Sequence, residues 1–259
     1  MPSDQRPLRP IGLIGSLVWF GIPAAVFAAF ILGLLPWLIR RGVGAYPTFI
    51  ATFVLPLALM LGAVFVVYRL EGRPFTWPAV RDRLRLGRMN RGDWLWTLGL
   101  VVGTFALQSA IDPVRNALQG VVFYAAPPEF VQFMGTLQQG SFGFDLTGRW
   151  DVFLFVALGM AVFNIGGEEL WWRGIILPRQ ELALGRWAWL VNGFLWDLFH
   201  FFYHTTLGSV VGYLPATLPL AFVAQRRRNT WPGIIAHYIG NIALPIALLY
   251  RVLGRPLPF

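Results

Sequence analysis

Long apolar runs constrain this chain more than any other feature of its sequence. A helix needs about 20 residues to cross the hydrocarbon core of a bilayer, which is about 30 Å thick. Only 13% of the 259 residues are charged, against about 25% in an ordinary soluble domain. The pattern predicts an all-α, polytopic membrane helix bundle of about seven transmembrane helices, at residues 11–39, 48–68, 94–111, 152–177, 187–204, 209–224 and 231–250.

The composition also excludes several kinds of chemistry. The chain has no cysteine, which rules out disulfides, thiolate catalysis and thiolate metal sites. The net charge of +9 comes from arginines in the loops between apolar spans, and no soluble basic region is present to hold a nucleic acid. We therefore expect the lipid bilayer, and no nucleic acid, as the partner of these charges.

The placement of the arginines predicts the orientation. With the N-terminus inside, fourteen arginines lie on the inner side and six on the outer side, as the positive-inside rule requires. The Arg-only, Trp- and Gly-rich composition suggests a bacterium, so we expect the cytoplasmic (inner) membrane. The inner arginines are Arg6, Arg9, Arg69, Arg73, Arg81, Arg83, Arg85, Arg88, Arg91, Arg179, Arg186, Arg226, Arg227 and Arg228.

Ionisable groups divide the chain into two parts. The first three predicted spans contain no carboxylate and no histidine, so residues 1–111 are interpreted as framework, with an Arg-rich interfacial segment at 71–93. Residues 112–150 form an interfacial loop. Residues 151–250 hold the buried polar groups, which are costly in a bilayer and mark a functional site by default. These groups are Glu168, Glu169, Asp197, His200, His204 and His237.

The first polar motif is Glu168-Glu169 followed by Arg173. Glu169 and Arg173 are four residues apart, so they share a helix face and can form an ion pair. Glu168 lies about 100° around the helix from Glu169 and has no obvious local partner. A carboxylate in an apolar site becomes a better base near neutral pH. We interpret Glu168 as catalytic and the other two as structural; the alternative is a purely structural cluster.

The second motif contains two histidines in one stripe. Trp196, His200 and His204 are spaced by four residues. Asp197 precedes His200 by three residues, and we expect it to hold one ring nitrogen of His200 and to set its tautomer. We interpret His200 as functional and His204 as an interfacial histidine at the end of a span.

The third motif is His237 with Asn241, four residues apart on one predicted helix face. A lone membrane histidine usually forms a helix–helix hydrogen bond worth less than about 1 kcal/mol. Two further polar stripes in the same protein favour a functional interpretation here.

Together the motifs resemble the signature of the CPBP family. This family of membrane proteases includes the CAAX prenyl endopeptidases and the bacteriocin-processing or self-immunity (Abi-like) proteins of bacteria. Its pattern is Glu-Glu-x-x-x-Arg, Phe-x-x-x-His and His-x-x-x-Asn or Asp. The first and third motifs match fully, whereas Trp196 replaces the phenylalanine of the second. The resemblance covers about residues 151–245.

The resemblance implies a peptide hydrolase in which Glu168 activates a water molecule. The catalytic residues that it implies are Glu168, His200, His237 and Asn241, with Glu169, Arg173 and Asp197 in support.

The residues leave the metal dependence open. Glu168, His200 and His237 could hold a catalytic zinc ion, as in a metalloprotease. Alternatively, the histidines and Asn241 could donate to the tetrahedral oxyanion while Glu168 moves the proton. The metal-free scheme is slightly favoured, because asparagine is a poor zinc ligand and a good oxyanion donor.

The leading functional hypothesis is an intramembrane endopeptidase acting on a membrane-bound or lipid-bearing peptide or protein. A catalytically idle scaffold or immunity protein, and a proton or solute carrier, are the alternatives. The lack of an internal repeat counts against the carrier, and three intact motifs count against the scaffold. At a rise of about 1.5 Å per residue, Glu168 and His237 are predicted to lie in the cytoplasmic half of the membrane.

Overall fold

The computed structural model describes residues 7–257. Regular structure in this range is helical, apart from one isolated antiparallel bridge between Val122 and Thr206. Residues 1–6, which include Arg6 of the predicted inner arginines, and residues 258–259 lie outside the described part of the chain. The all-α fold class predicted from the sequence is confirmed.

The chain is an integral membrane protein, because several of its helices are long and apolar enough to span a bilayer. Five such segments lie within residues 7–257. A sixth candidate span consists of α13 (Trp231–Gly240) and α14 (Ala243–Val252), which meet at a bend of 52°. The five segments are Leu13–Arg40, Ala45–Leu70, Arg91–Ala117, Trp150–Phe202 and Leu207–Arg227.

The predicted count of seven spans is not confirmed. The predicted spans 152–177 and 187–204 both fall within the single segment Trp150–Phe202. This segment has 53 residues, which at about 1.5 Å per residue is more than twice the thickness of the hydrocarbon core. It is interrupted at Gly185, where φ is +56°, and the helix that follows packs back against the one before.

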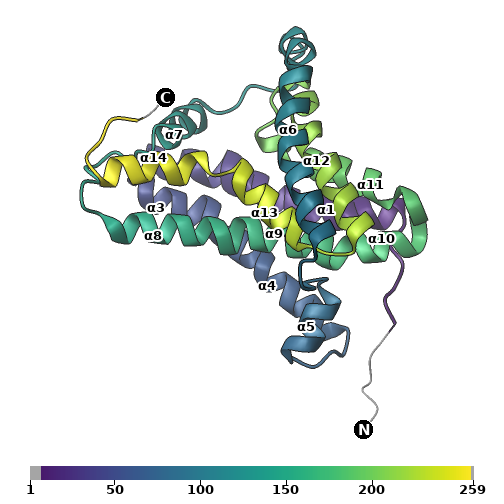
Figure 1. Cartoon of the computed structure of the whole chain (residues 1–259). Helices are drawn as coiled ribbons and strands as arrows, with labels where there is room; N and C mark the ends of the chain where they lie inside the picture. Colours follow the sequence, from purple (N-terminus) through teal and green to yellow (C-terminus); the bar gives the residue numbers. More distant parts are fainter. Residues whose placement is uncertain (1–6, 258–259) are drawn as a thin grey trace.

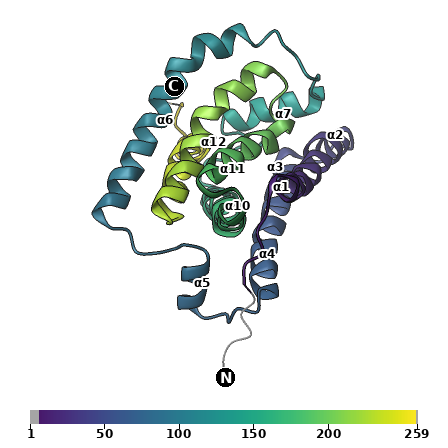
Figure 2. The same cartoon turned by 90° about the vertical axis from the view of Figure 1, so that its right-hand side faces the viewer.

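Helices of the first half flank the central helices of the second half on two sides. Figure 2 shows α6 on one side of α12 and α13, and α1 and α4 on the other. The first half contains α1 (Leu13–Ala28), α2 (Leu35–Arg40), α3 (Ala45–Phe49), α4 (Leu55–Leu70), α5 (Trp77–Arg83), α6 (Arg91–Ala117) and α7 (Pro128–Gln138). The second half, shown with the first in Figure 1, contains α8 (Trp150–Gly159), α9 (Gly167–Glu169), α10 (Leu177–Leu184), α11 (Ala188–Phe199) and α12 (Leu207–Arg227), before α13 and α14.

Wider, π-helical turns interrupt several spans, and three of them lie directly before a Leu-Pro pair. Proline has no N–H for the carbonyl four residues earlier, and a π turn is one way in which a helix accommodates the missing bond. The three are η1 (Ala29–Leu34) before Pro36, η2 (Ile50–Val54) before Pro56 and η4 (Leu170–Ile176) before Pro178. A fourth, η3 (Met160–Gly166), leads into α9.

Aromatic side chains fill the centre of the bundle. Trp172 is completely buried and stacks on Phe20 of α1, with 4.3 Å between ring centroids. Gly167 lies against α4, where the Leu57 carbonyl oxygen is 3.5 Å from the position that a Cβ would occupy. The absence of a side chain at Gly167 therefore allows the backbones of the two helices to approach each other closely beside Glu168.

The two connecting segments differ from simple surface loops. In the segment 71–93, predicted to lie along the inner membrane surface, Trp77 is exposed but Arg83 and Leu84 are buried. In the segment 112–150, α7 buries its apolar face, including Phe133. Both segments therefore contribute to the interior of the protein.

Candidate active site

Glu168 lies on α9, and two indole groups fix its side chain. Its carboxylate is almost completely buried, with 4% of the residue exposed. Atom Oε2 accepts a hydrogen bond of 2.8 Å from Trp196 Nε1 and one of 3.3 Å from Trp172 Nε1. Because indole donors are neutral, they fix the carboxylate without neutralising its charge. Both bonds go to Oε2, which leaves Oε1 for other groups.

His200 faces the same carboxylate oxygen. Its Nδ1 lies 2.8 Å from the Trp196 carbonyl oxygen, which can only accept a hydrogen bond. Nδ1 therefore carries the proton, and in the neutral ring Nε2 has a free lone pair. This Nε2 lies 4.0 Å from Glu168 Oε2, a distance across which one water molecule can bridge the two groups.

Glu169 binds both Arg173 and His237. Its Oε1 accepts hydrogen bonds from Arg173 Nη1 at 3.1 Å and from His237 Nδ1 at 3.0 Å. The predicted Glu169–Arg173 pair is therefore present, and both side chains are fully buried. The Arg173 guanidinium also lies 3.9 Å from the centre of the Trp196 ring. This network links α13 to the helix that carries both glutamates.

Asp197 does not contact His200 as we expect from the sequence; it faces His204 instead. Asp197 Oδ1 lies 3.1 Å from His204 Nε2, although the angles are not those of a hydrogen bond. The reason is local: α11 ends at Phe199 and a 3₁₀ turn follows, so the side chains after it leave the predicted stripe. His204 is also buried within the protein, with 6% exposed.

Asn241 lies at the break between α13 and α14. It is the first residue after α13, and its Nδ2 donates to the His237 carbonyl oxygen at 3.1 Å. The predicted continuous helix face of residues 231–250 therefore ends here. The His237 ring points to Glu169, whereas Asn241 lines a neighbouring cavity.

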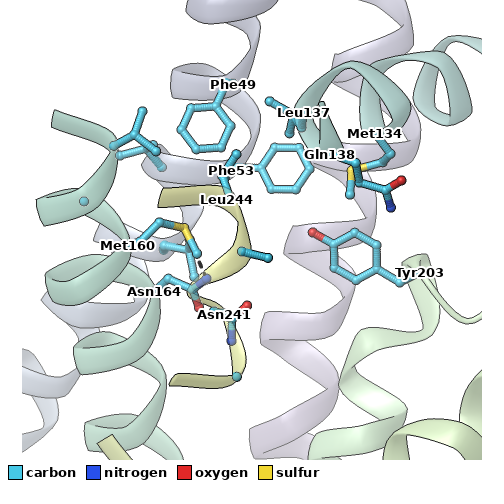
Figure 3. Close-up of a pocket in the computed structure, with 16 residues that line it drawn as sticks. Phe49, Phe53, Met134, Leu137, Gln138, Met160, Asn164, Tyr203, Asn241 and Leu244 are labelled. Atoms are coloured by element: carbon cyan, nitrogen blue, oxygen red, sulfur yellow. Dashed lines mark hydrogen bonds between the residues drawn. The ribbon is translucent and has the colours of Figure 1, made fainter. Parts of the chain in front are cut away.

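A cavity of about 450 Å³ lies beside these residues, between η2, η3, α7 and the start of α14 (Figure 3). Most of its lining is apolar, including Phe49, Phe53 and Leu137. Its polar lining groups are Gln138, Asn164, Tyr203 and Asn241.

The cavity borders the glutamate and histidine cluster at two residues. The Tyr203 ring stacks on His200, with 6.2 Å between centroids, and Asn164 precedes Glu168 by four residues on the same helical segment. The Oδ1 atom of Asn164 is buried and has no hydrogen-bond partner among residues 7–257. An apolar group with a few polar atoms suits this cavity.

Three residues of the site escape sequence reasoning, namely Trp172, Tyr203 and Asn164. Trp172 follows Glu168 by four residues, and that spacing could have indicated the contact. The position of Tyr203 depends on the 3₁₀ turn after α11, which leaves no periodic signal in the sequence.

The donor set does not fit a metal ion in this arrangement. No group of three or more His, Asp or Glu residues within 7–257 is placed to hold one. The hydrogen bonds above use His237 Nδ1 and Glu168 Oε2 and leave His237 Nε2 and Glu168 Oε1 as possible ligand atoms, but with His200 these residues are not grouped as a metal site in this arrangement. We therefore derive no catalytic step through a metal.

Comparison with known families adds an independent finding. Residues 150–243 match the family described as type II CAAX prenyl endopeptidase Rce1-like. No curated protein and no solved structure matched the chain. The matched range contains all three motifs, from Glu168 to Asn241. Over residues 150–243 the chain is therefore similar to CAAX-type membrane proteases, which supports the resemblance to the CPBP family that its motifs carry.

Proposed function

We propose that this protein is an intramembrane endopeptidase that hydrolyses a peptide bond of a membrane-associated peptide or protein. One observation carries the proposal. The Glu168 carboxylate is buried and oriented by two indole N–H groups, and it faces His200 Nε2 across 4.0 Å. Such a pair of acceptors can orient one water molecule for attack, and the match of residues 150–243 to a CAAX endopeptidase family also supports a protease.

In the proposed reaction, a water molecule donates its two protons toward Glu168 and His200 Nε2. Its free lone pair then attacks the peptide carbonyl carbon, a C–O bond forms, and one proton moves to Glu168. When the tetrahedral intermediate collapses, the C–N bond breaks and Glu168 returns the proton to the leaving amine nitrogen. The products are a carboxylic acid and an amine, and Glu168 is regenerated.

His237 is the group proposed to stabilise the oxyanion. Its Nδ1 is fixed by Glu169, which Arg173 also binds. A His237 ring protonated on both nitrogens presents Nε2–H to the developing charge, and such a preorganised donor is a large source of rate enhancement. Asn241, also predicted as an oxyanion donor, binds the His237 carbonyl and supports this helix end instead.

The cavity beside the site supports a substrate with an apolar portion. Its apolar lining and volume of about 450 Å³ suit a bulky side chain or the lipid of a lipid-bearing substrate. We place the protein in the bacterial inner membrane, with the N-terminus and the site toward the cytoplasm, because the positive-inside rule favours this orientation.

The proposal is tested by comparing wild type with Glu168→Gln in the native host and identifying new protein termini in the membrane fraction by terminal-labelling mass spectrometry. Glu129→Gln, a carboxylate on α7 paired with exposed Arg40, is the matched control. We expect termini that appear with wild type and the control but not with Glu168→Gln. Identical termini in all three, with each protein inserted and folded, would favour the idle scaffold.

A further inference from the structure

The end of the Arg-rich segment lies inside the protein, between the helix that carries the glutamates and the helix that carries His237. Arg83 donates through Nη1 to the Gly174 carbonyl oxygen at 2.5 Å, and its own charge is bound by Glu71 through two bonds of 2.6 Å. Only 2% of the Arg83 side chain is exposed. A buried arginine held in this way is a fixed part of the fold.

The Gly174 carbonyl oxygen lacks its α-helical hydrogen-bond donor and needs another one. Pro178, four residues later, has no N–H, so the ordinary α-helical bond to Gly174 cannot form. Gly174 also lets the segment approach, because a Cβ at this position would lie 3.3 Å from Leu84 Cδ2. The guanidinium of Arg83 therefore replaces the backbone donor that Pro178 lacks, and it does so at Gly174, the residue directly after Arg173.

The same segment holds the start of α13. Thr230 is the N-cap residue of α13, but its hydroxyl donates to the Leu84 carbonyl at 2.8 Å rather than capping its own helix. The Thr230 N–H donates to the Arg85 carbonyl, also at 2.8 Å. Residues 83–85 thus bind both helices that contribute to the active site, and we name them the brace.

We propose that the brace sets the position of the glutamate helix relative to the His237 helix, with Arg83 as a positioning residue. Residues 83–85 lie outside the range 150–243 that matches the family, so the N-terminal framework completes the catalytic core. The positioning role rests on the proposed function, whereas the mechanical role of the brace does not.

The test compares amide hydrogen exchange in Arg83→Met, Arg73→Met and the double variant Arg83→Met/Pro178→Ala. In Arg83→Met, Glu71 keeps its bonds to Arg73 and Arg179, so no carboxylate is left unpaired. Arg73→Met is the matched control, because it removes an arginine from the same carboxylate without touching a helix carbonyl.

We expect amides of residues 174–182 to exchange roughly five- to tenfold faster in Arg83→Met, as the loss of one hydrogen bond implies, and to be unchanged in Arg73→Met. Pro178→Ala restores an N–H for Gly174 and should return the exchange of the double variant toward wild type. Equal exchange in Arg83→Met and Arg73→Met, or no recovery with Pro178→Ala, overturns the brace.

If Arg83→Met does not fold, Thr230→Val tests the other end of the brace. It removes the hydroxyl bond to Leu84 and keeps the shape of the side chain, so exchange in residues 231–237 should increase. Unchanged exchange there overturns the proposal.

Activity on the cleaved substrate separates the two proposals. Arg83→Met should lower kcat by as much as about 100-fold, as a displacement of about 1 Å can do, with KM and the cleavage position unchanged. If Arg83→Met loses activity only in proportion to its loss of folded protein, Arg83 supports folding alone and its positioning role is overturned. If Glu168→Gln still cleaves, the proposed function fails, while the exchange result still decides the brace.

Discussion

Trp196→Phe isolates the hydrogen bond that orients Glu168. Phenylalanine is the residue of the family pattern at this position, and it keeps an aromatic ring beside Arg173. The bond that it removes is 2.8 Å long and ends on a carboxylate. Interhelical hydrogen bonds in membranes contribute about 0.6 kcal/mol on average and at most about 1.7 kcal/mol, and charged acceptors lie at the upper end.

Two losses therefore add in the free energy of unfolding of Trp196→Phe. The lost hydrogen bond should lower the free energy of unfolding by about 1.5 kcal/mol, and the smaller ring leaves a void that costs on the order of 1 kcal/mol. We expect a total loss of about 2.5 kcal/mol. Catalysis should also fall, because Glu168 keeps only the longer bond of 3.3 Å from Trp172.

Trp171→Phe provides the matched control. Trp171 is also buried, but its Nε1 has no hydrogen-bond partner among residues 7–257. The same substitution at Trp171 should lower the free energy of unfolding only through the void that the smaller ring leaves, by about 1 kcal/mol or less. Equilibrium unfolding in mixed detergent measures both variants. If Trp196→Phe and Trp171→Phe lose equal stability and Trp196→Phe keeps full activity, the indole bond does not support Glu168 as argued.

Three further outcomes follow from the structure. Burial alone would raise the pKa of Glu71, but the hydrogen bonds and charge of Arg83 outweigh burial and hold the pKa below its ordinary value of 4.5. The stability that the ionised Glu71 contributes should therefore be complete above pH 4.5 and disappear as the pH falls through the lower folded-state pKa. Glu71→Gln should abolish this acid dependence in thermal unfolding. Gly233→Ala should cost about 1–3 kcal/mol, since its Cβ would lie 2.7 Å from a buried glutamate oxygen, whereas Gly240→Ala, with nothing within 4 Å, should be nearly neutral in the same assay. Because the chain has no cysteine, Arg228→Cys gives a single thiol, and an impermeant reagent should label it only after the cells are opened; labelling in intact cells would contradict the N-terminus-in orientation.

The sequence predicts local relationships in this protein well. The Glu169–Arg173 pair follows from a spacing of four residues on one helix, and the structure contains it. The membrane location follows from apolar length. Both properties depend only on neighbouring residues, which share a helix face whatever the rest of the chain does.

The sequence fails where a helix is interrupted. The predicted contact between Asp197 and His200 assumes a continuous helix, but α11 ends at Phe199. Asn241 is separated from the predicted face in the same way, because α13 ends at Gly240. The predicted count of seven spans, which is not confirmed, likewise treats residues 231–250 as one continuous helix, whereas α13 and α14 meet at a bend of 52°. Hydropathy does not mark these breaks, since apolar residues continue through them.

Sequence alone therefore determines that this chain is a helical membrane protein, which residues are its ionisable groups, and which family its motifs indicate. Only the tertiary structure decides which groups meet. The two indole donors of Glu168 come from different helical segments, His237 reaches Glu169 from α13, and Arg83 reaches Gly174 across 91 residues of chain. The reason is physical: side-chain period and hydropathy act over one or two turns, whereas these contacts depend on how whole helices pack after prolines, glycines and π turns have set their directions.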